Sequence, residues 1–180
     1  SYTSCLHLLS TLGWWRSPEL MNIHHAEELN EAFHLAVMES LGGDRRWSDR
    51  FMAFHAAIAY YWFLVVMFFL SPASSYGFSE LLEGHAVDTY AQLLEENAET
   101  LRALPAPDVA RVYFEDFIYY FDAFQMERDT VRRPDINSLY DVFVNIFRDE
   151  EEHVKTMKAC REYTSEGKRI KYKGRDLRSK

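Results

Sequence analysis

Two copies of a Glu-x-x-His motif, far apart in the chain, constrain its fold more than any other feature. Glu31 and His34 form one copy, and Glu150 and His153 form the other, each within a long helical pattern. Residues three positions apart share one face of a helix, so each pair aims a carboxylate and an imidazole in the same direction. A single pair arises by chance in any acidic helix. Two pairs are the ligands that two helices contribute to a di-iron or di-manganese four-helix bundle, whose other two helices supply one glutamate each.

The composition is that of an acidic, helical domain. Only 7 glycines and 5 prolines occur in 180 residues, which favours helices around one continuous core. The formal net charge is −8, which argues against nucleic acid as a partner. Seven of the 20 basic residues follow position 164. We therefore divide the chain into a bundle domain, 1–164, and a basic tail, 165–180. The tail could touch anionic lipid, but we expect it to be a solvated end.

The cysteines and the first residues carry little functional signal. Cys5 and Cys160 fit no metal-binding or redox spacing, so we interpret them as free buried thiols. No targeting segment is recognisable. The opening residues have the character of a helix interior, so we expect the natural chain to begin upstream.

The spacing of apolar residues, together with the positions of glycine and proline, predicts a succession of long helices. Gly13 ends a first short helix, Gly42 and Gly43 end a second, and Pro72 begins another. The predicted helices cover residues 1–12, 24–41, 51–70, 72–103 and 137–163.

The segment 51–70 is the most apolar part of the chain and is long enough to span a bilayer. His55 lies in its first half, and a Tyr-Tyr-Trp cluster at 60–62 lies near its middle and not at its ends. Interfacial aromatics belong at the ends of a spanning helix. We therefore predict a helix that lies in one membrane leaflet or covers the apolar side of a bundle.

The residues alone leave the remaining ligands open. Carboxylates and imidazoles without a thiolate cluster favour iron or manganese over structural zinc or an iron–sulfur cluster. The helix 72–103 offers Glu80 or Glu83 as its single glutamate. The fourth glutamate should precede Glu31, but no acidic residue occurs in 1–18. Either the first helix continues upstream with that ligand or the centre is incomplete; Glu27 has suitable geometry but shares a helix with Glu31.

These residues and the motifs around them resemble the alternative oxidase family, and within it the plastid terminal oxidase branch. The resemblance runs from about residue 13 to 163. It rests on the motifs GWWR (13–16), AEELNEAFHL (26–35), MESLGG (38–43), LSPASSYGFSE (70–80), EGHAVDTY (83–90), PAPD (105–108), RRPDINSLYDVFVNI (132–146) and DEEEH (149–153). The segment 132–146 resembles an insertion typical of the plastid branch, which favours plastoquinol over ubiquinol.

The resemblance implies an all-α, ferritin-like di-iron four-helix bundle, with 51–70 as an added helix on the membrane surface. It implies a monotopic quinol oxidase of the thylakoid membrane, active in chlororespiration, that oxidises plastoquinol and reduces O₂ to water with two non-haem iron ions. It favours Glu83 over Glu80, because the family's glutamate stands seven positions before a tyrosine, here Tyr90. The implied iron ligands are Glu31, His34, Glu83, Glu150 and His153, with one more expected upstream of Ser1.

The resemblance also implies roles beyond the ligands. Tyr90 matches the family's redox tyrosine near the iron pair, and Ala86 and Thr89 match positions that line the quinone pocket. Asn30 and Asp149 each precede a ligand glutamate and are candidate partners of the ligands, although neighbouring positions on a helix point in different directions. Members of the family tend to associate, so a homodimer is expected by analogy.

Three other functions fit part of the sequence. A mitochondrial-type ubiquinol oxidase would use the same ligands. A ferritin-like iron-oxidising protein would also use a di-iron bundle, but it leaves the apolar segment 51–70 unexplained. A metal-free scaffold on a membrane surface would require that the two Glu-x-x-His pairs be coincidental.

Overall fold

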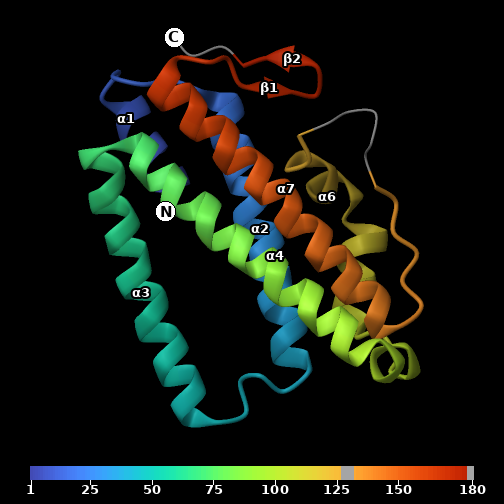
Figure 1. Ribbon diagram of the computed structural model, residues 1–180. Coiled ribbons are helices and arrows are strands. Elements are labelled where there is room, and N and C mark those ends of the chain that lie inside the picture. The colour runs from blue at the N-terminus through green and yellow to red at the C-terminus, as the bar shows by residue number, and fades with distance from the viewer. Residues whose placement is uncertain (127–131, 178–180) are drawn as a thin grey trace.

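The computed structural model describes residues 1–126 and 132–177. Long helices dominate it, with short helical turns before the last long helix and a small hairpin after it (Figure 1). In chain order the elements are α1 (Tyr2–Thr11), α2 (Pro18–Ser40), α3 (Trp47–Leu70), α4 (Pro72–Ala103), α5 (Asp108–Arg111), the π-helical turn η1 (Val112–Asp116), α6 (Ile118–Ala123), α7 (Leu139–Glu166), β1 (Lys171–Tyr172) and β2 (Arg175–Asp176).

Helices α2, α4 and α7 form the body of the molecule, and α3 stands beside it (Figure 1). The most extensive contact joins α4 and α7, whereas α3 contacts α4 and α1. The all-α class with an added apolar helix is thus confirmed. The hairpin was not predicted; it pairs Lys171 with Asp176 and Tyr172 with Arg175.

The ends of the long helices follow from local chemistry. Helix α2 begins at Pro18, earlier than predicted, because proline suits the first helical position and Glu19 complements the helix dipole. At the start of α4, the Ser71 hydroxyl accepts a hydrogen bond from the Ser74 amide at 3.2 Å. Helix α7 continues to Glu166, where Gly167 adopts a left-handed conformation with φ +68°.

Two apolar clusters fill the interior, one towards each end of the long helices. One contains Val37 of α2 together with Phe143 and Ile146 of α7. The other contains Leu20 of α2 and Met157 of α7. Between these positions α2 and α7 carry the two Glu-x-x-His motifs. The fold therefore holds the predicted ligands at the seam between two apolar clusters, where the helices are fixed on both sides.

Helix α3 leaves most of its apolar surface uncovered. Of its large side chains, Leu64 and Phe68 are buried, whereas Trp62 is 60 % exposed and Val66 57 %. Among the helices that the structure describes, α3 alone is long and apolar enough to cross a membrane, with a mean hydropathy of 1.9 over its best window.

The segment after α7 folds back onto the protein, unlike the solvated end that we expected. Ile170 is buried in the second apolar cluster. The Tyr172 hydroxyl donates to the Ala123 carbonyl at 2.6 Å, and the Lys173 amide donates to the Met126 carbonyl at 2.7 Å. The division of the chain at residue 164 stays a prediction, and α7 runs two residues past it.

The start of α7 offers a test of helix capping. Ser138 and Asp141 form a capping box, in which the Ser138 hydroxyl accepts from the Asp141 amide and the Asp141 carboxylate accepts from the Ser138 amide. We expect Ser138→Ala to lower the free energy of unfolding by about 1 kcal/mol, measured by chemical denaturation. Ser165→Ala, which removes an exposed hydroxyl bonded to the Arg161 carbonyl, is the control. An equal loss in both variants would contradict the capping role.

Candidate metal centre

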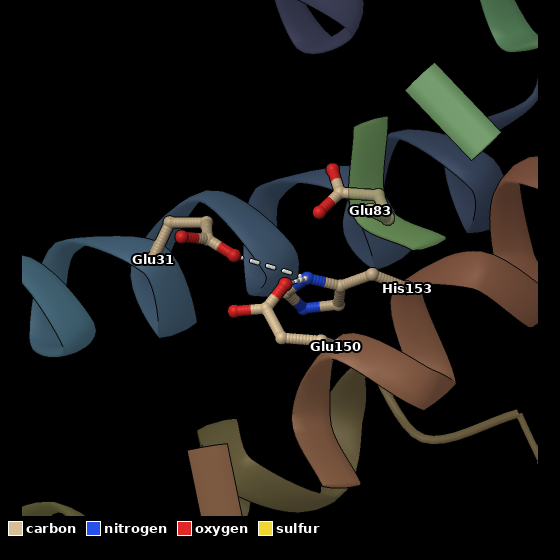
Figure 2. A group of neighbouring side chains, drawn as sticks. All are labelled: Glu31, Glu83, Glu150 and His153. Atoms are coloured by element: carbon tan, nitrogen blue, oxygen red, sulfur yellow. Dashed lines mark ion pairs between the residues drawn. The ribbon is translucent and has the colours of Figure 1, made fainter. Parts of the chain in front are cut away.

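Three helices bring four ligand-type side chains together at the seam. Glu31 comes from α2, Glu83 from α4, and Glu150 and His153 from α7 (Figure 2). The ligand atoms that they offer all lie within 4.8 Å of one another. The Nδ1 atom of His153 is 3.0 Å from a Glu31 oxygen and 3.7 Å from a Glu150 oxygen. Both members of the α7 motif therefore face the same point as Glu31, as their spacing predicts.

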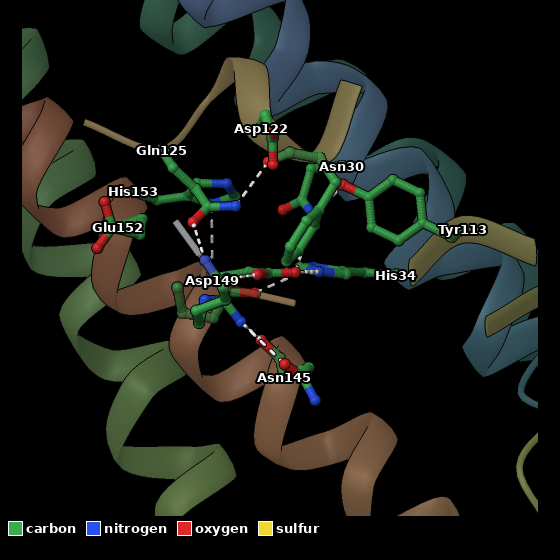
Figure 3. Close-up of polar contacts among 12 residues, drawn as sticks. Asn30, His34, Tyr113, Asp122, Gln125, Asn145, Asp149, Glu152 and His153 are labelled. Carbon is green, nitrogen blue, oxygen red and sulfur yellow. Dashed lines mark hydrogen bonds and ion pairs between the residues drawn. The ribbon is translucent and has the colours of Figure 1, made fainter. Parts of the chain in front are cut away.

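His34, the other member of the α2 motif, adjoins this cluster. Its Nδ1 atom is 3.2 Å from Glu150 Oε1 and 3.6 Å from Glu31 Oε2. Its Nε2 atom is 3.0 Å from Asp149 Oδ2. Asp149 is fully buried and accepts a second hydrogen bond from Asn30 Nδ2 at 2.9 Å (Figure 3). Asn30 and Asp149 thus bond to each other, and Asp149 supports His34 across the interface between α2 and α7.

The hydrogen bond from His34 to Asp149 leaves the other ring nitrogen of His34 free to bind a metal. Since a carboxylate can only accept, His34 Nε2 carries the proton that it donates to Asp149, and Nδ1 can present its lone pair. Among the described residues, buried His34 Nδ1 has no hydrogen-bond partner, although it lies 3.2 Å from Glu150 Oε1. Buried polar atoms are normally satisfied, so this unsatisfied imidazole nitrogen beside carboxylates indicates a ligand that binds there.

Glu80 and Glu83, the two candidates on α4, have different surroundings. Glu80 lies outside the cluster, and its Oε2 accepts a hydrogen bond from Arg161 Nε at 2.6 Å. Glu83 faces the carboxylates of the cluster (Figure 2). Glu27, the alternative on α2, bonds to His24 Nδ1 at 2.8 Å and does not join the cluster.

Without a metal, protons must balance the charges of this cluster. Burial raises the pKa of Glu83 to about 8; His153 lowers it, and repulsion from Glu31 and Glu150 raises it. Although burial lowers the pKa of His34 and of His153, attraction to the neighbouring carboxylates raises both well above the usual value. Although burial raises the pKa of Glu31 and of Glu150, attraction to the imidazoles brings both below the usual value. A bound cation would replace these protons.

The donor set fits iron or manganese. Carboxylate oxygens and imidazole nitrogens suit these ions, whereas both cysteines belong to the second apolar cluster. The centre is enclosed by α7, where the side chains of Glu150 and His153 are nearly inaccessible. It is open beside α2, where the Glu31 side chain is 50 % exposed.

Comparison with known proteins agrees with this geometry. Residues 2–162 match the family described as Alternative oxidase. The chain belongs to the alternative oxidase family. It is 48 % identical over 162 residues to ubiquinol oxidase 4, chloroplastic/chromoplastic, of Arabidopsis thaliana. The match covers 89 % of this chain and 46 % of the relative, so the chain spans about half the length of that protein. No solved structure matches the chain.

Alternative oxidases are di-iron proteins, and the cluster between α2, α4 and α7 consists of glutamate and histidine side chains able to hold metal ions. The individual ligand assignments, on Glu31, His34, Glu83, Glu150 and His153, stay predictions. So does the further ligand that we expect upstream of Ser1.

The other predicted residues follow Glu83 along α4. Tyr90 is half-buried, with its ring centroid 6.1 Å from that of Phe143. Burial raises the pKa of Tyr90, and the negative charges of Glu150 and Glu31 raise it further, so the phenol stays protonated beside the cluster. Ala86 is half-buried. Thr89 is exposed, and its hydroxyl donates to the His85 carbonyl at 2.8 Å.

Two residues of the site escaped the sequence analysis. The Tyr113 hydroxyl, at the π-helical turn η1, accepts a hydrogen bond from Asn30 Nδ2 at 2.7 Å (Figure 3). Arg132, before α7, pairs with Asp149. Neither has a local signal, because each contact joins segments that are distant in sequence. A π-helical turn is often associated with a functional site, but it is not recognisable from residue types.

We expect the metal-free protein to lose thermal stability as the pH rises from about 5 to about 8. Burial raises the pKa of Glu83 from 4.5 to about 8, so the folded state holds this proton more tightly than the unfolded state. That contribution is complete below the unfolded value and is lost as the pH passes the folded one. The raised pKa values of His34 and His153 act in the same direction.

The measurement is the Tm by scanning calorimetry in the presence of a chelator at several pH values. Glu83→Gln should flatten the pH dependence. Glu80→Gln, which alters a carboxylate outside the cluster, should show the same pH dependence of the Tm as the wild-type protein. A Tm that increases over this pH range in the wild-type protein would refute the charge balance described above.

Proposed function

We propose that the protein is a non-haem di-iron quinol oxidase that oxidises plastoquinol and reduces O₂ to water. The observation that carries this proposal is the cluster of carboxylates and imidazoles on α2, α4 and α7, in a chain of the alternative oxidase family. Two quinols supply the four electrons and four protons that convert one O₂ into two waters. An iron pair supplies the redox chemistry that amino-acid side chains lack.

The residues of this chain hold the metal and control protons around it. Glu31, Glu83 and Glu150 would offset the positive charge of the irons, and His34 would bind through its free Nδ1 atom. Asp149 holds the proton of His34 on Nε2, so that the ring keeps the tautomer that can bind.

We assign Tyr90, Ala86 and Thr89 to the quinol and its oxidation. Ala86 and Tyr90 lie one and two turns beyond Glu83 on α4, so they share its face. Thr89 is next to Tyr90 and exposes its side chain. In this role the Tyr90 phenol, kept protonated by burial and by nearby carboxylates, supplies a hydrogen atom from its hydroxyl and recovers it from the quinol.

The choice of quinol rests on the resemblance of 132–146 to the insertion of the plastid branch. The Arabidopsis relative is named a chloroplastic ubiquinol oxidase, which keeps ubiquinol as the second candidate. We further propose that the protein is monotopic on the thylakoid membrane, with α3 in one leaflet, and that it forms a homodimer by analogy with its family.

Replacing Glu150 or Glu83 by alanine should abolish quinol-dependent O₂ uptake in the full-length protein, because each change removes a carboxylate from the cluster. An oxygen electrode measures the uptake, with plastoquinol and ubiquinol analogues compared side by side. Glu80→Ala, on the same helix as Glu83 but paired with Arg161, should retain uptake. Full activity in Glu150→Ala or Glu83→Ala would reject the ligand assignment, and a clear preference for ubiquinol would reject the plastoquinol assignment.

The membrane role of α3 can be tested on its exposed face. Trp62 and Val66 are one turn apart and largely exposed. We expect Trp62→Gln with Val66→Gln to weaken binding to phosphatidylcholine vesicles by roughly 2 kcal/mol, or about thirty-fold, in a flotation assay. The conservative pair Trp62→Phe and Val66→Ile should bind like wild type. Equal binding by the polar and conservative pairs would place the membrane contact elsewhere.

A further inference from the structure

Arg132 covers the buried carboxylate that supports His34. Its guanidinium donates through Nη2 to Asp149 Oδ1, and through Nη1 to Asn145 Oδ1 at 3.1 Å and to the Asn145 carbonyl at 3.2 Å. Asp149 uses its other oxygen for His34 Nε2 and Asn30 Nδ2. The two carboxylate oxygens therefore face opposite ways, one towards Arg132 and one towards the candidate metal centre.

Charge makes Arg132 the necessary partner of this carboxylate. Asp149 has no solvent exposure, and a buried carboxylate is costly unless a positive charge and hydrogen bonds compensate it. Asn30 is neutral, and His34 is neutral when Nδ1 binds a metal. Among the described residues, Arg132 is then the one cation that contacts Asp149.

The surroundings of Arg132 fix its position. Its backbone amide donates to Gln125 Oε1 at 3.1 Å, and its guanidinium carbon lies 5.0 Å from the centroid of the Phe121 ring. The planar guanidinium donates in several directions at once, which a lysine ammonium cannot reproduce in the same plane. The neighbouring Arg133 differs, because its side chain is 54 % exposed and pairs with Asp122 at the surface.

We propose that Arg132 is a positioning residue for His34, acting through Asp149, and that it raises the affinity of the centre for iron. This inference rests on the proposed function for the identity of the metal and for His34 as a ligand. Held by Arg132, the Asp149 carboxylate keeps Oδ2 directed at His34 Nε2, which fixes the ring so that Nδ1 faces the cluster. Residues that orient a histidine ligand in this way commonly change metal affinity ten- to a hundred-fold when they are replaced.

The experiment measures iron affinity in the full-length protein by titration of Fe²⁺ under anaerobic conditions, with bound iron determined by mass spectrometry. We expect Arg132→Gln to weaken iron binding at least about ten-fold. Arg132→Lys keeps the positive charge but loses the planar guanidinium donors, so it should recover part of the affinity. Arg133→Gln is the matched control and should bind iron like wild type, because a surface ion pair contributes little. Circular dichroism melting identifies any variant that loses affinity by unfolding.

A double-mutant cycle with Asp149→Asn tests the route of the effect. If Arg132 acts through Asp149, adding Arg132→Gln to Asp149→Asn should change iron affinity by less than about two-fold. Additive losses would overturn the proposal, as would wild-type affinity in a folded Arg132→Gln protein. A wild-type protein that binds no iron would overturn the proposed function and this inference together, whereas unchanged affinity in Arg132→Gln alone overturns only the inference.

Discussion

The structure depends on how the charges of several carboxylates between α2, α4 and α7 are compensated. Glu31, Glu83 and Glu150 lie together in the metal-binding cluster, and the buried Asp149 adjoins Glu150. Like charges at this separation repel strongly in a low-dielectric interior unless cations or protons intervene. In the metal-free protein, the protonated imidazoles of His34 and His153 and the guanidinium of Arg132 supply that compensation. In the di-iron form, the metal would replace the imidazole protons. The contacts around the cluster therefore bring positive groups next to these carboxylates.

The apolar clusters on either side of the seam give the polar residues a fixed geometry. Val37 and Ile146 pack on one side, and Leu20 and Met157 on the other. A helix held at two points along its length cannot rotate a motif away from its partner. The long helices therefore position the ligands. The turn η1, the residues after α6 and the segment before α7 supply Tyr113, Gln125 and Arg132 around them.

Local patterns in the sequence predicted what depends on a single helix. The spacing of Glu31 with His34, and of Glu150 with His153, gives the inward direction of each pair, and Pro72 gives the start of α4. Contacts between elements were not predictable in the same way. The bond from Asn30 to Asp149 joins positions 119 residues apart, so it depends on the register of α2 against α7. The sequence indicated both residues as candidate partners of the ligands, but it did not predict their bond to each other.

The fold of the C-terminal segment was also not predictable from its sequence. Its basic residues suggested a solvated end, yet the side chain of Ile170 is buried. The Lys173 amide and the Tyr172 hydroxyl donate to the backbone carbonyls of Met126 and Ala123. One apolar residue in a charged segment is too weak a pattern to predict docking, because a single buried side chain contributes only a few kcal/mol against the entropy of ordering the chain.

The order of the elements also relates the apolar surface to the metal centre. Helix α3 ends at Leu70 and α4 begins at Pro72, so the two helices are joined through Ser71 without a loop. Glu83 lies on α4 some three turns beyond that junction. Near this junction, the helix that carries a ligand-type glutamate thus contacts the helix with the uncovered apolar surface, and the two helices diverge beyond it (Figure 1). Under the proposed function, a quinol that partitions into the leaflet with α3 meets α4 without crossing water, and the face of α4 with Ala86 and Tyr90 then leads it towards the irons.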